Sequence, residues 1–443
     1  MFYKLRIFLL ICLFMLLVSV SISAVAAANS PARVQQAYFP AKVVFVNQHS
    51  LWFVNGYQAG AQPVPLTKKG IASPIGWSST GEWFAYMWEE KEDYDHTKEL
   101  WVVNPTKKIW RLVEKDADII EGHQAWSPTG AMIAYMTSHF SKPEDKRYSS
   151  IKVANLKGDK PVITAIVSDR PYVEDFTWHP DGKSLTVSYM RTEQHPMTVE
   201  RVALDGTSSV LFNIGETKKA EEEIYSSAIV GMKWSPDGEY LAYFIRPNSG
   251  SMSADANDIE AINIKTKQRI ALGGGLKYPA WFAWSPDSTQ LAYIDGEGRE
   301  AVSDKALCIF DTKSGKIVQA GQKGTADIQP VWSPSSPARL LFIRGPVTKW
   351  NDYQNRRIWQ RTSDGNEQAV TSAARTVTDY HAVPLADGKG FLFLRSSLSK
   401  QPVGSLYFQS FSASKPVEWI RGIDWNPGYY GNFLPATFSV YQD

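Results

Sequence analysis

A unit that recurs about every fifty residues predicts an all-β protein, a β-propeller built of four-stranded antiparallel blades. The unit is clearest at Trp234-Ser235-Pro236-Asp237-Gly238, which the apolar run 240–244 follows at once. Seven copies keep the turn, and they begin at Trp77, Trp126, Trp178, Trp234, Trp284, Trp332 and Pro384. No amphipathic helix of ten or more residues recurs within the period, which argues against a helical solenoid.

Each residue type in the unit has a physical reason. A tryptophan at the end of a strand offers ~150–250 Å² of surface for burial between neighbouring sheets. Proline presets its own φ, and Asp-Gly supplies a position with positive φ, so the chain reverses in a tight hairpin. Three apolar or alternating stretches follow in the unit, for example 83–87, 100–103 and 109–113. Together with the strand that ends at the tryptophan, they predict four strands per blade.

The two ends of the chain predict how the ring closes. Stretches 43–46, 51–54 and 63–66 match the second, third and fourth strands of a unit whose first strand is missing. The stretch 437–441 can supply that first strand, so pairing of the two termini would complete the blade and remove exposed sheet edges. Seven whole units and one shared unit favour eight blades. Seven blades are the alternative, if the amino-terminal strands only cover an edge.

The first 28 residues predict a signal peptide. Lys4 and Arg6 precede the apolar run Ile7–Val18, and small residues at 24–28 offer a cleavage site. The expected organisation is a signal peptide at 1–28, a short lead at 29–40 and a single propeller domain at 41–443. An exported protein is expected, in the periplasm, outside the cell or at its surface. An uncleaved membrane anchor is the alternative, because apolar and small residues over 7–28 could just span a bilayer.

Composition excludes several classes of function. The 47 lysines and arginines nearly balance the 45 aspartates and glutamates, so the chain lacks the concentrated basic face that nucleic acid requires. Outside the leader Cys308 is the only cysteine, and no intrachain disulfide can form. No Gly-x-Ser-x-Gly, phosphate-loop or His-Glu-x-x-His motif occurs. We therefore expect a monomer with no cofactor and no nucleic-acid partner.

The loops divide unequally between the two ends of the blades. Links between strands one and two, and between three and four, are tight turns, whereas links between strands two and three are long. In an up-and-down blade these two kinds of link emerge on opposite faces, and we call the second one the long-loop face. Long loops usually carry function, so we expect a protein or cell-envelope partner on this face. The long links are 89–99, 138–149, 246–258, 296–305 and 346–357, and the ligand-binding candidates are Tyr94, Tyr148, Gln329, Trp350 and Tyr353.

The residue three before each tryptophan should enter the central channel, if the first strand of each blade is innermost. These positions hold Pro74, His123, Asp175, Gly231, Trp281, Gln329 and His381. Two histidines and a carboxylate around one channel mouth could act as acid and base, with His123, Asp175 and His381 as catalytic candidates. They could also bind a metal ion, with His123, His381 and Glu174 as candidate ligands. The other interpretation is that these side chains hydrogen-bond one another and water in a wet channel.

The repeated Trp-Ser-Pro-Asp-Gly with Leu-Ala-Tyr after it, at 234–243 and 284–293, resembles the repeat of the TolB-type propellers. The propeller domains of prolyl oligopeptidase-like peptidases and of tricorn-like proteins share this repeat. The resemblance covers nearly the whole chain after the leader. It implies an exported envelope protein whose propeller binds other proteins, notably a peptidoglycan-associated lipoprotein. Strands that begin near residue 42 leave no room for the amino-terminal α/β domain of TolB, and no hydrolase-sized region lies outside the repeats.

The function expected from the sequence is therefore that of a secreted, non-catalytic propeller. Its long-loop face would bind a protein, a peptide or a cell-envelope component. The alternative is a propeller enzyme, such as a polysaccharide lyase or hydrolase, with a His/Asp site at the channel mouth. Metal-binding histidines at the channel of some related lyases are part of what the resemblance implies.

Overall fold

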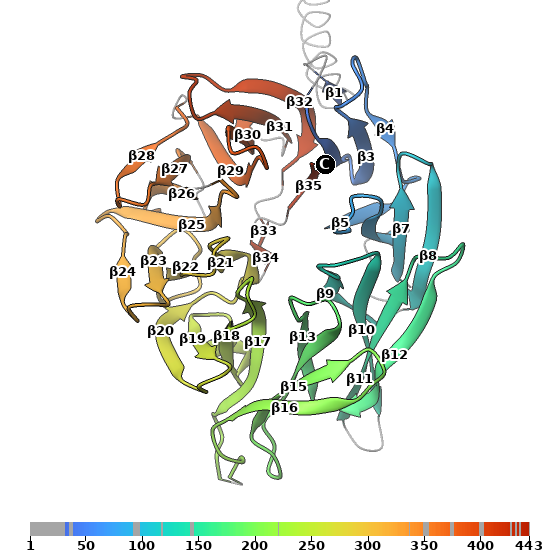
Figure 1. Ribbon diagram of the computed structural model, residues 1–443, viewed down its shortest axis with the longest axis vertical. Helices are drawn as coiled ribbons and strands as arrows, with labels where there is room; N and C mark the ends of the chain where they lie inside the picture. Colours follow the sequence, from blue (N-terminus) through green and yellow to red (C-terminus); the bar gives the residue numbers. More distant parts are fainter. Residues whose placement is uncertain are drawn as a thin grey trace, which may run out of the picture.

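The chain forms a closed ring of eight β-sheets around a central axis (Figure 1). This computed structural model describes residues 32–34, 39–91, 98–116, 118–141, 146–219, 221–335, 337–348, 354–372, 376–397, 403–425, 428–429, 432–433 and 436–442. Each sheet is antiparallel, and its strands follow one another outward from the axis. The prediction of an eight-bladed propeller is confirmed, and the seven-bladed alternative is excluded.

Seven blades are built of four consecutive strands, the first of which is innermost (Figure 1). Blade 2 contains β5 (Ile71–Trp77), β6 (Phe84–Glu89), β7 (Lys98–Asn104) and β8 (Ile109–Asp116). Blade 3 contains β9 (Ile119–Trp126), β10 (Met132–Ser141), β11 (Lys146–Asn155) and β12 (Val162–Pro171). Blade 4 contains β13 (Val173–Trp178), β14 (Ser184–Tyr189), β15 (Met197–Ala203) and β16 (Ser208–Ile214). Blade 5 contains β17 (Ser226–Trp234), β18 (Tyr240–Pro247), β19 (Asn257–Asn263) and β20 (Arg269–Gly275). Blade 6 contains β21 (Ala283–Trp284), β22 (Gln290–Asp295), β23 (Ala306–Asp311) and β24 (Ile317–Gln319). Blade 7 contains β25 (Thr325–Trp332), β26 (Leu340–Pro346), β27 (Arg357–Arg361) and β28 (Glu367–Ala369). Blade 8 contains β29 (Val377–Pro384), β30 (Gly390–Ser397), β31 (Val403–Ser410) and β32 (Val417–Asp424).

The ring is closed by two seams, of which the sequence predicted one. In blade 1, β35 (Phe438–Tyr441) is the innermost strand and pairs with β2 (Lys42–Asn47), outside which lie β3 (Ser50–Asn55) and β4 (Val64–Pro65). This confirms the predicted pairing of the two ends. The second seam is β1 (Arg33–Val34), which adds a fifth strand to the outer edge of blade 8 by pairing with β32. Part of the expected lead at 29–40 is thus a strand of the ring.

The repeated tryptophans join each blade to the blade before it. Their rings pack between blades, as predicted, and their indole N–H groups also donate hydrogen bonds across the gap. The acceptors are the carbonyl oxygens of Ser439 for Trp77, Gly76 for Trp126, Ala125 for Trp178, Lys233 for Trp284 and Ala283 for Trp332, at 2.8–3.4 Å. Trp234 donates instead to the Thr186 hydroxyl at 3.0 Å and is only 8% exposed. The tryptophan of the unit therefore supplies both apolar burial and a polar bond between blades.

The serine of the unit holds the tight turn together. The Ser235 hydroxyl is buried and accepts the backbone N–H of Tyr240 at 3.0 Å, where the second strand begins. Neighbouring turns also nest against one another. A Cβ on Gly182, whose φ is +65°, would lie 1.9 Å from the Thr129 hydroxyl of the preceding blade. Glycine at this position is therefore required by φ and by space.

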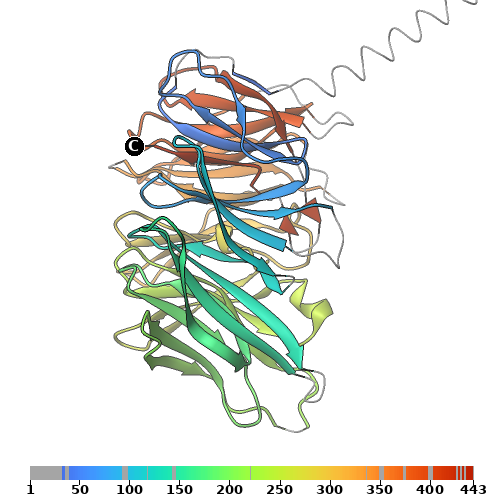
Figure 2. The same ribbon diagram turned by 90° about the vertical axis from the view of Figure 1, so that its right-hand side faces the viewer.

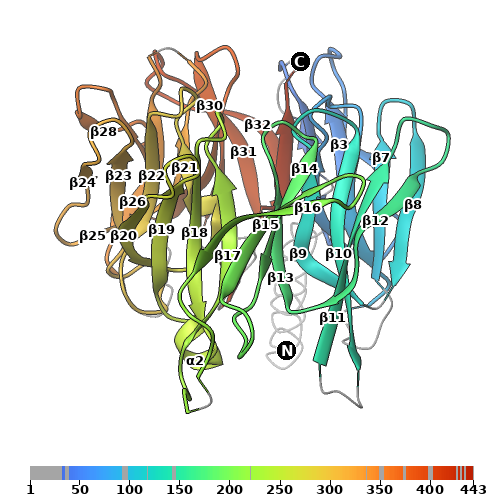
Figure 3. The ribbon, with the colours of Figure 1, turned by 60° about the horizontal axis from the view of Figure 1, so that its bottom comes forward.

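The long links gather on one face, as expected. Figure 3 shows the short helix α2 (Gly250–Ser253) and the outer end of the β10–β11 hairpin projecting from one face, with the C-terminus on the other. The link at 138–149 is mostly strand, because β10 extends to Ser141 and β11 starts at Lys146. A small hairpin of β33 (Gly428–Tyr429) and β34 (Asn432–Phe433) lies near the axis on the long-loop face (Figures 1 and 2).

Within the described residues, no helix has the length and apolar character needed to cross a membrane. The predicted signal peptide at 1–28 lies outside the residues that the structure describes.

Candidate functional site

The innermost strands bulge at the positions predicted to enter the channel. Pairing of the innermost strand with its neighbour shifts register in blades 2, 3, 4, 5, 7 and 8. Gly231, Gln329 and His381 have φ of 64°, 51° and 51°, which is uncommon for residues other than glycine. A bulge turns side chains out of the regular alternation of a strand and is frequent next to functional sites. The ring of channel positions is therefore a repeated backbone feature.

Gln329 and His381 form one polar pair across blades 7 and 8. The Gln329 side-chain oxygen accepts the backbone N–H of His381 at 3.2 Å, and the Gln329 amide nitrogen lies 3.2 Å from Nδ1 of His381. Because the oxygen is already used, the amide nitrogen must face and donate to Nδ1, which requires a neutral ring. Burial lowers the pKa of His381 to about 4, in agreement with this arrangement.

His123 and Asp175 form a second pair, across blades 3 and 4. His123 Nε2 lies 3.6 Å from Asp175 Oδ1, and His123 Nδ1 lies 3.2 Å from the carbonyl oxygen of Glu121, to which it can donate. Asp175 Oδ2 also accepts the backbone N–H of Gly231 in blade 5 at 2.6 Å. Burial raises the pKa of the Asp175 carboxyl, against the opposing effects of His123 and two backbone N–H groups. Asp175 therefore connects three blades at the channel wall.

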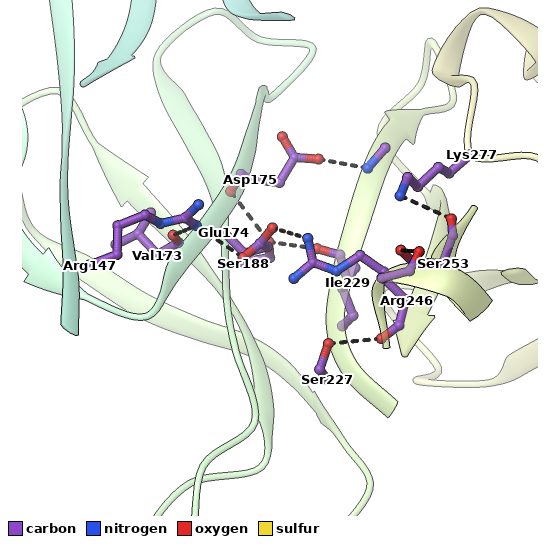
Figure 4. A network of polar contacts seen from close by, with 12 residues as sticks. Arg147, Val173, Glu174, Asp175, Ser188, Ser227, Ile229, Arg246, Ser253 and Lys277 are labelled. Atoms are coloured by element: carbon purple, nitrogen blue, oxygen red, sulfur yellow. Dashed lines mark hydrogen bonds and ion pairs between the residues drawn. The ribbon is translucent and has the colours of Figure 1, made fainter. Parts of the chain in front are cut away.

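A group of charged side chains surrounds Glu174, the neighbour of Asp175 (Figure 4). The Glu174 side chain is 8% exposed and accepts from Arg147 Nη2 at 3.1 Å and from Arg246 Nη1 at 2.5 Å. Lys277, in the link between blades 5 and 6, donates from Nζ to the carbonyl oxygen of Ser253 in α2 at 3.0 Å. Burial lowers the pKa of Lys277, and the positive charge of Arg246 lowers it further. Arg147 of blade 3 and Arg246 of blade 5 therefore meet at one carboxylate, and Lys277 lies near Arg246 without an ion pair to Glu174 among the described contacts.

These two groups share a cavity of about 210 Å³ at the long-loop end of the innermost strands. Its lining combines charged and polar side chains with glycines and two apolar residues. The lining residues are Gly122, His123, Glu174, Asp175, Val230, Gly231, Arg246, Lys277 and Pro279. We call it the charged cavity. It combines a histidine–carboxylate pair with cationic side chains, which is a setting for binding a polar ligand or for proton transfer.

A larger cavity of about 720 Å³ lies in the half of the channel nearer the tight turns. The tryptophans of five successive units and the prolines of three turns line it, together with Gln329 and His381. Its wall includes Trp126, Trp178, Trp234, Trp284, Trp332, Pro128, Pro180 and Pro236. The face of tight turns thus opens into an aromatic channel, because the tryptophans that join the blades also border the axis.

The structure brings some of the predicted site residues together and separates others. His123 contacts Asp175 and His381 contacts Gln329, so the two histidines belong to different pairs. Among the described residues no group of three or more His, Cys, Asp or Glu side chains could hold a metal ion. His123, His381 and Glu174 therefore do not converge on one metal site there.

The aromatic candidates on the long loops have different outcomes. Tyr94, Trp350 and Tyr353 lie outside the described residues. Tyr148 is half-buried in β11 and stacks on His139, with ring centroids 5.9 Å apart. Sequence reasoning missed Arg147, Arg246 and Lys277, although a buried Glu174 next to Asp175 implies nearby cations.

Comparison with known proteins gives few relatives in sequence and many in fold. The chain matches no family model. It is 25% identical over 200 residues to Dipeptidyl-peptidase 5 of Porphyromonas gingivalis, a match that covers 43% of this chain and 28% of that protein. The structure of dipeptidyl peptidase 4 from the same species matches 89% of this chain and 60% of its own, with a TM-score of 0.56 and 10% identity. A eukaryotic initiation factor matches 88% of both chains, with a TM-score of 0.53 and 14% identity.

These comparisons correct the expected function. At such low identities the structural matches show the propeller fold alone, and the initiation factor and the peptidase share it. The sequence match, by contrast, is to a protein named as a peptidase, of which it covers 28%. The expectation of a non-catalytic binding module is therefore wrong, and the comparisons favour its alternative, a propeller enzyme such as a polysaccharide lyase or hydrolase. Of the TolB-type resemblance, the propeller fold is what the structure bears out.

Proposed function

We propose that this chain acts in peptide hydrolysis, as a propeller that admits a peptide and orients it at the long-loop face. The observation that carries the proposal is the match to Dipeptidyl-peptidase 5 over 200 residues. Since this match spans 28% of that protein, the activity of the whole relative does not transfer automatically. We further propose that the chain is exported, as the pattern of residues 1–28 predicts.

The charged cavity supports a role in holding a substrate. Its cationic side chains can donate hydrogen bonds to a carbonyl oxygen or a carboxylate, and Asp175 and Glu174 are held in place by charged and backbone partners. In the part of the chain that the structure describes, no serine hydroxyl is hydrogen-bonded to a histidine ring. The proposal therefore assigns substrate orientation to these residues and leaves the hydrolytic nucleophile unassigned.

A second candidate is acid–base chemistry on an acidic polysaccharide. It is favoured by the 3.6 Å approach of His123 to Asp175 beside two cations, because a histidine–carboxylate pair can move a proton while cations hold an acidic sugar.

One experiment tests both candidates. The full-length protein is incubated with a set of synthetic peptides of three to ten residues and, separately, with polygalacturonate, and the products are identified by mass spectrometry. We expect cleavage of peptides, with a rate at least ten-fold lower in Arg246→Gln and unchanged in Lys313→Met, a control on the tight-turn face. If all peptides stay intact, the peptidase proposal is wrong. Cleavage of polygalacturonate instead, with loss in His123→Ala, would support the second candidate.

A further inference from the structure

Two cationic side chains line the charged cavity. They are Arg246 and Lys277, which lie beside the carboxyl groups of Glu174 and Asp175. Arg246 and Lys277 both line the same space, and their charges repel each other there. Two like charges facing one cavity are unfavourable unless something of opposite charge lies between them.

The carboxyl groups of Glu174 and Asp175 are not free to lie between Arg246 and Lys277 as the opposite charge. Both oxygens of Glu174 are used, one by Arg147 and one by Arg246. Both oxygens of Asp175 are used as well, by the backbone N–H groups of Phe176 and Gly231. All four carboxyl oxygens therefore already have hydrogen-bond partners within the protein.

The cations, by contrast, keep donors that no described residue accepts. Lys277 has three N–H bonds, and its contact among the described residues is with the carbonyl oxygen of Ser253. Arg246 has five N–H bonds and uses Nη1 for Glu174, so Nε and Nη2 are left without an acceptor among the described residues. Arg246 is 25% exposed, and its exposed part lines the cavity together with Lys277. These side chains present fixed, unused donors to a small space.

The size and charge of this space select the kind of anion. About 210 Å³ is sufficient for a carboxylate with a few attached atoms. A single negative charge between Arg246 and Lys277 relieves their mutual repulsion, whereas a dianion would be repelled more strongly by the nearby Glu174 carboxylate. The apolar wall at Val230 and Pro279 suits the carbon atoms that a carboxylate brings with it. The C-terminus of a short peptide is a carboxylate of this kind, with a single charge and attached carbon atoms.

We propose that Arg246 and Lys277 bind a carboxylate in this cavity, and that its source is the C-terminal carboxylate of a short peptide. The peptide source rests on the proposed function, but the carboxylate site itself does not. Glu174 positions the guanidinium of Arg246, and the carbonyl oxygen of Ser253 positions the ammonium of Lys277.

The test compares matched probes by isothermal titration calorimetry with the full-length protein. The probes are N-acetyl-Ala-Ala-Ala with a free C-terminus, the same peptide as its C-terminal amide, N-acetyl-Ala-Asp-Ala amide and digalacturonate. We expect the free acid to bind at least ten-fold more tightly than its amide. Lys277→Met should remove this preference, Lys277→Arg should retain it, and Lys313→Met should leave it unchanged. Equal melting temperatures of the variants would show that the loss is not a loss of folding.

The other outcomes distinguish the two proposals. Equal affinities for the free acid and the amide would overturn the C-terminal source. If N-acetyl-Ala-Asp-Ala amide were the tighter peptide and depended on Lys277, the site would take a side-chain carboxylate. If digalacturonate alone bound, again with dependence on Lys277, the carboxylate site would stand and the peptide function would fail. If Lys277→Met and the native protein bound all four probes equally, the site itself would be refuted.

Discussion

Replacing Trp234 with alanine should destabilise the ring by ~3–5 kcal/mol, the range for removing a large buried aromatic side chain. The structure accounts for this magnitude in three contributions. Trp234 is 8% exposed, so almost its whole ring leaves an apolar environment between blades 4 and 5. Its indole N–H loses the hydrogen bond to Thr186, worth about 1 kcal/mol. Its edge-to-face contact with His179, at a centroid distance of 5.0 Å, adds ~0.5–1.5 kcal/mol.

Urea unfolding followed by far-UV circular dichroism measures the difference, and two variants isolate its causes. Trp234→Phe keeps most of the apolar volume and loses the N–H, so it should cost about 1–2 kcal/mol. Trp110→Ala is the matched control, because Trp110 also donates its indole N–H to a carbonyl oxygen, that of Leu66 at 2.9 Å, but is 40% exposed and therefore loses much less apolar burial. A loss in Trp234→Ala no larger than that in Trp110→Ala would refute the argument that the repeated tryptophans join the blades.

Two further predictions concern charge. The pKa of His381 is lowered to about 4 by burial, below its ordinary value of 6.5, so the unfolded chain binds a proton more readily as the pH falls between these values. As the pH falls from 7 to 4, the native protein should therefore lose stability relative to His381→Gln, by at most about 3 kcal/mol. If the thermal midpoints of the two proteins changed in parallel across this range, the prediction would be wrong. Asp327→Ala should cost ~3–5 kcal/mol, because Asp327 is fully buried and accepts two hydrogen bonds from Arg344. The buried guanidinium would keep Glu367 as its acidic partner and lose the other. Urea midpoints measure this loss of stability. The control is Glu239→Ala, which breaks the exposed ion pair between Glu239 and Lys265, and its stability should stay within about 1 kcal/mol of that of the native protein.

The fold was predictable because its information is local and repeated. One turn sequence, with a tryptophan before it and an apolar strand after it, sets the strand order, the innermost strand and the number of blades. The closing strand β35 was also predictable, because blade 1 lacked a first strand and a spare strand remained at the other end. The strand β1 was not, since two residues with no copy elsewhere in the chain carry no periodic signal.

The site was predictable in part, for a related reason. The repeat indicated which residues border the channel, and the bulges there place His123, Asp175, Gln329 and His381 as expected. Which of them touch follows from blade order, since neighbouring blades pair and distant blades do not. His123 and His381, grouped by chemistry, lie in blades 3 and 8 and therefore contact different partners. Arg246 and Lys277 have no equivalent in other blades, and their role depends on contacts across blades that a single sequence does not reveal.

The two seams also determine when the molecule can become complete. β2 is made near the start of the chain, but its inner partner β35 follows after all the other blades. Until then its backbone N–H and C=O groups form an open edge, next to apolar side chains such as Val44 and Phe45 that are fully buried in the finished ring. An open, apolar edge of this kind is a template for wrong pairing. During synthesis, blade 1 is therefore the part of the nascent protein most open to wrong strand pairing, although it is made first. Its open edge is covered only when the four residues of β35 pair with β2.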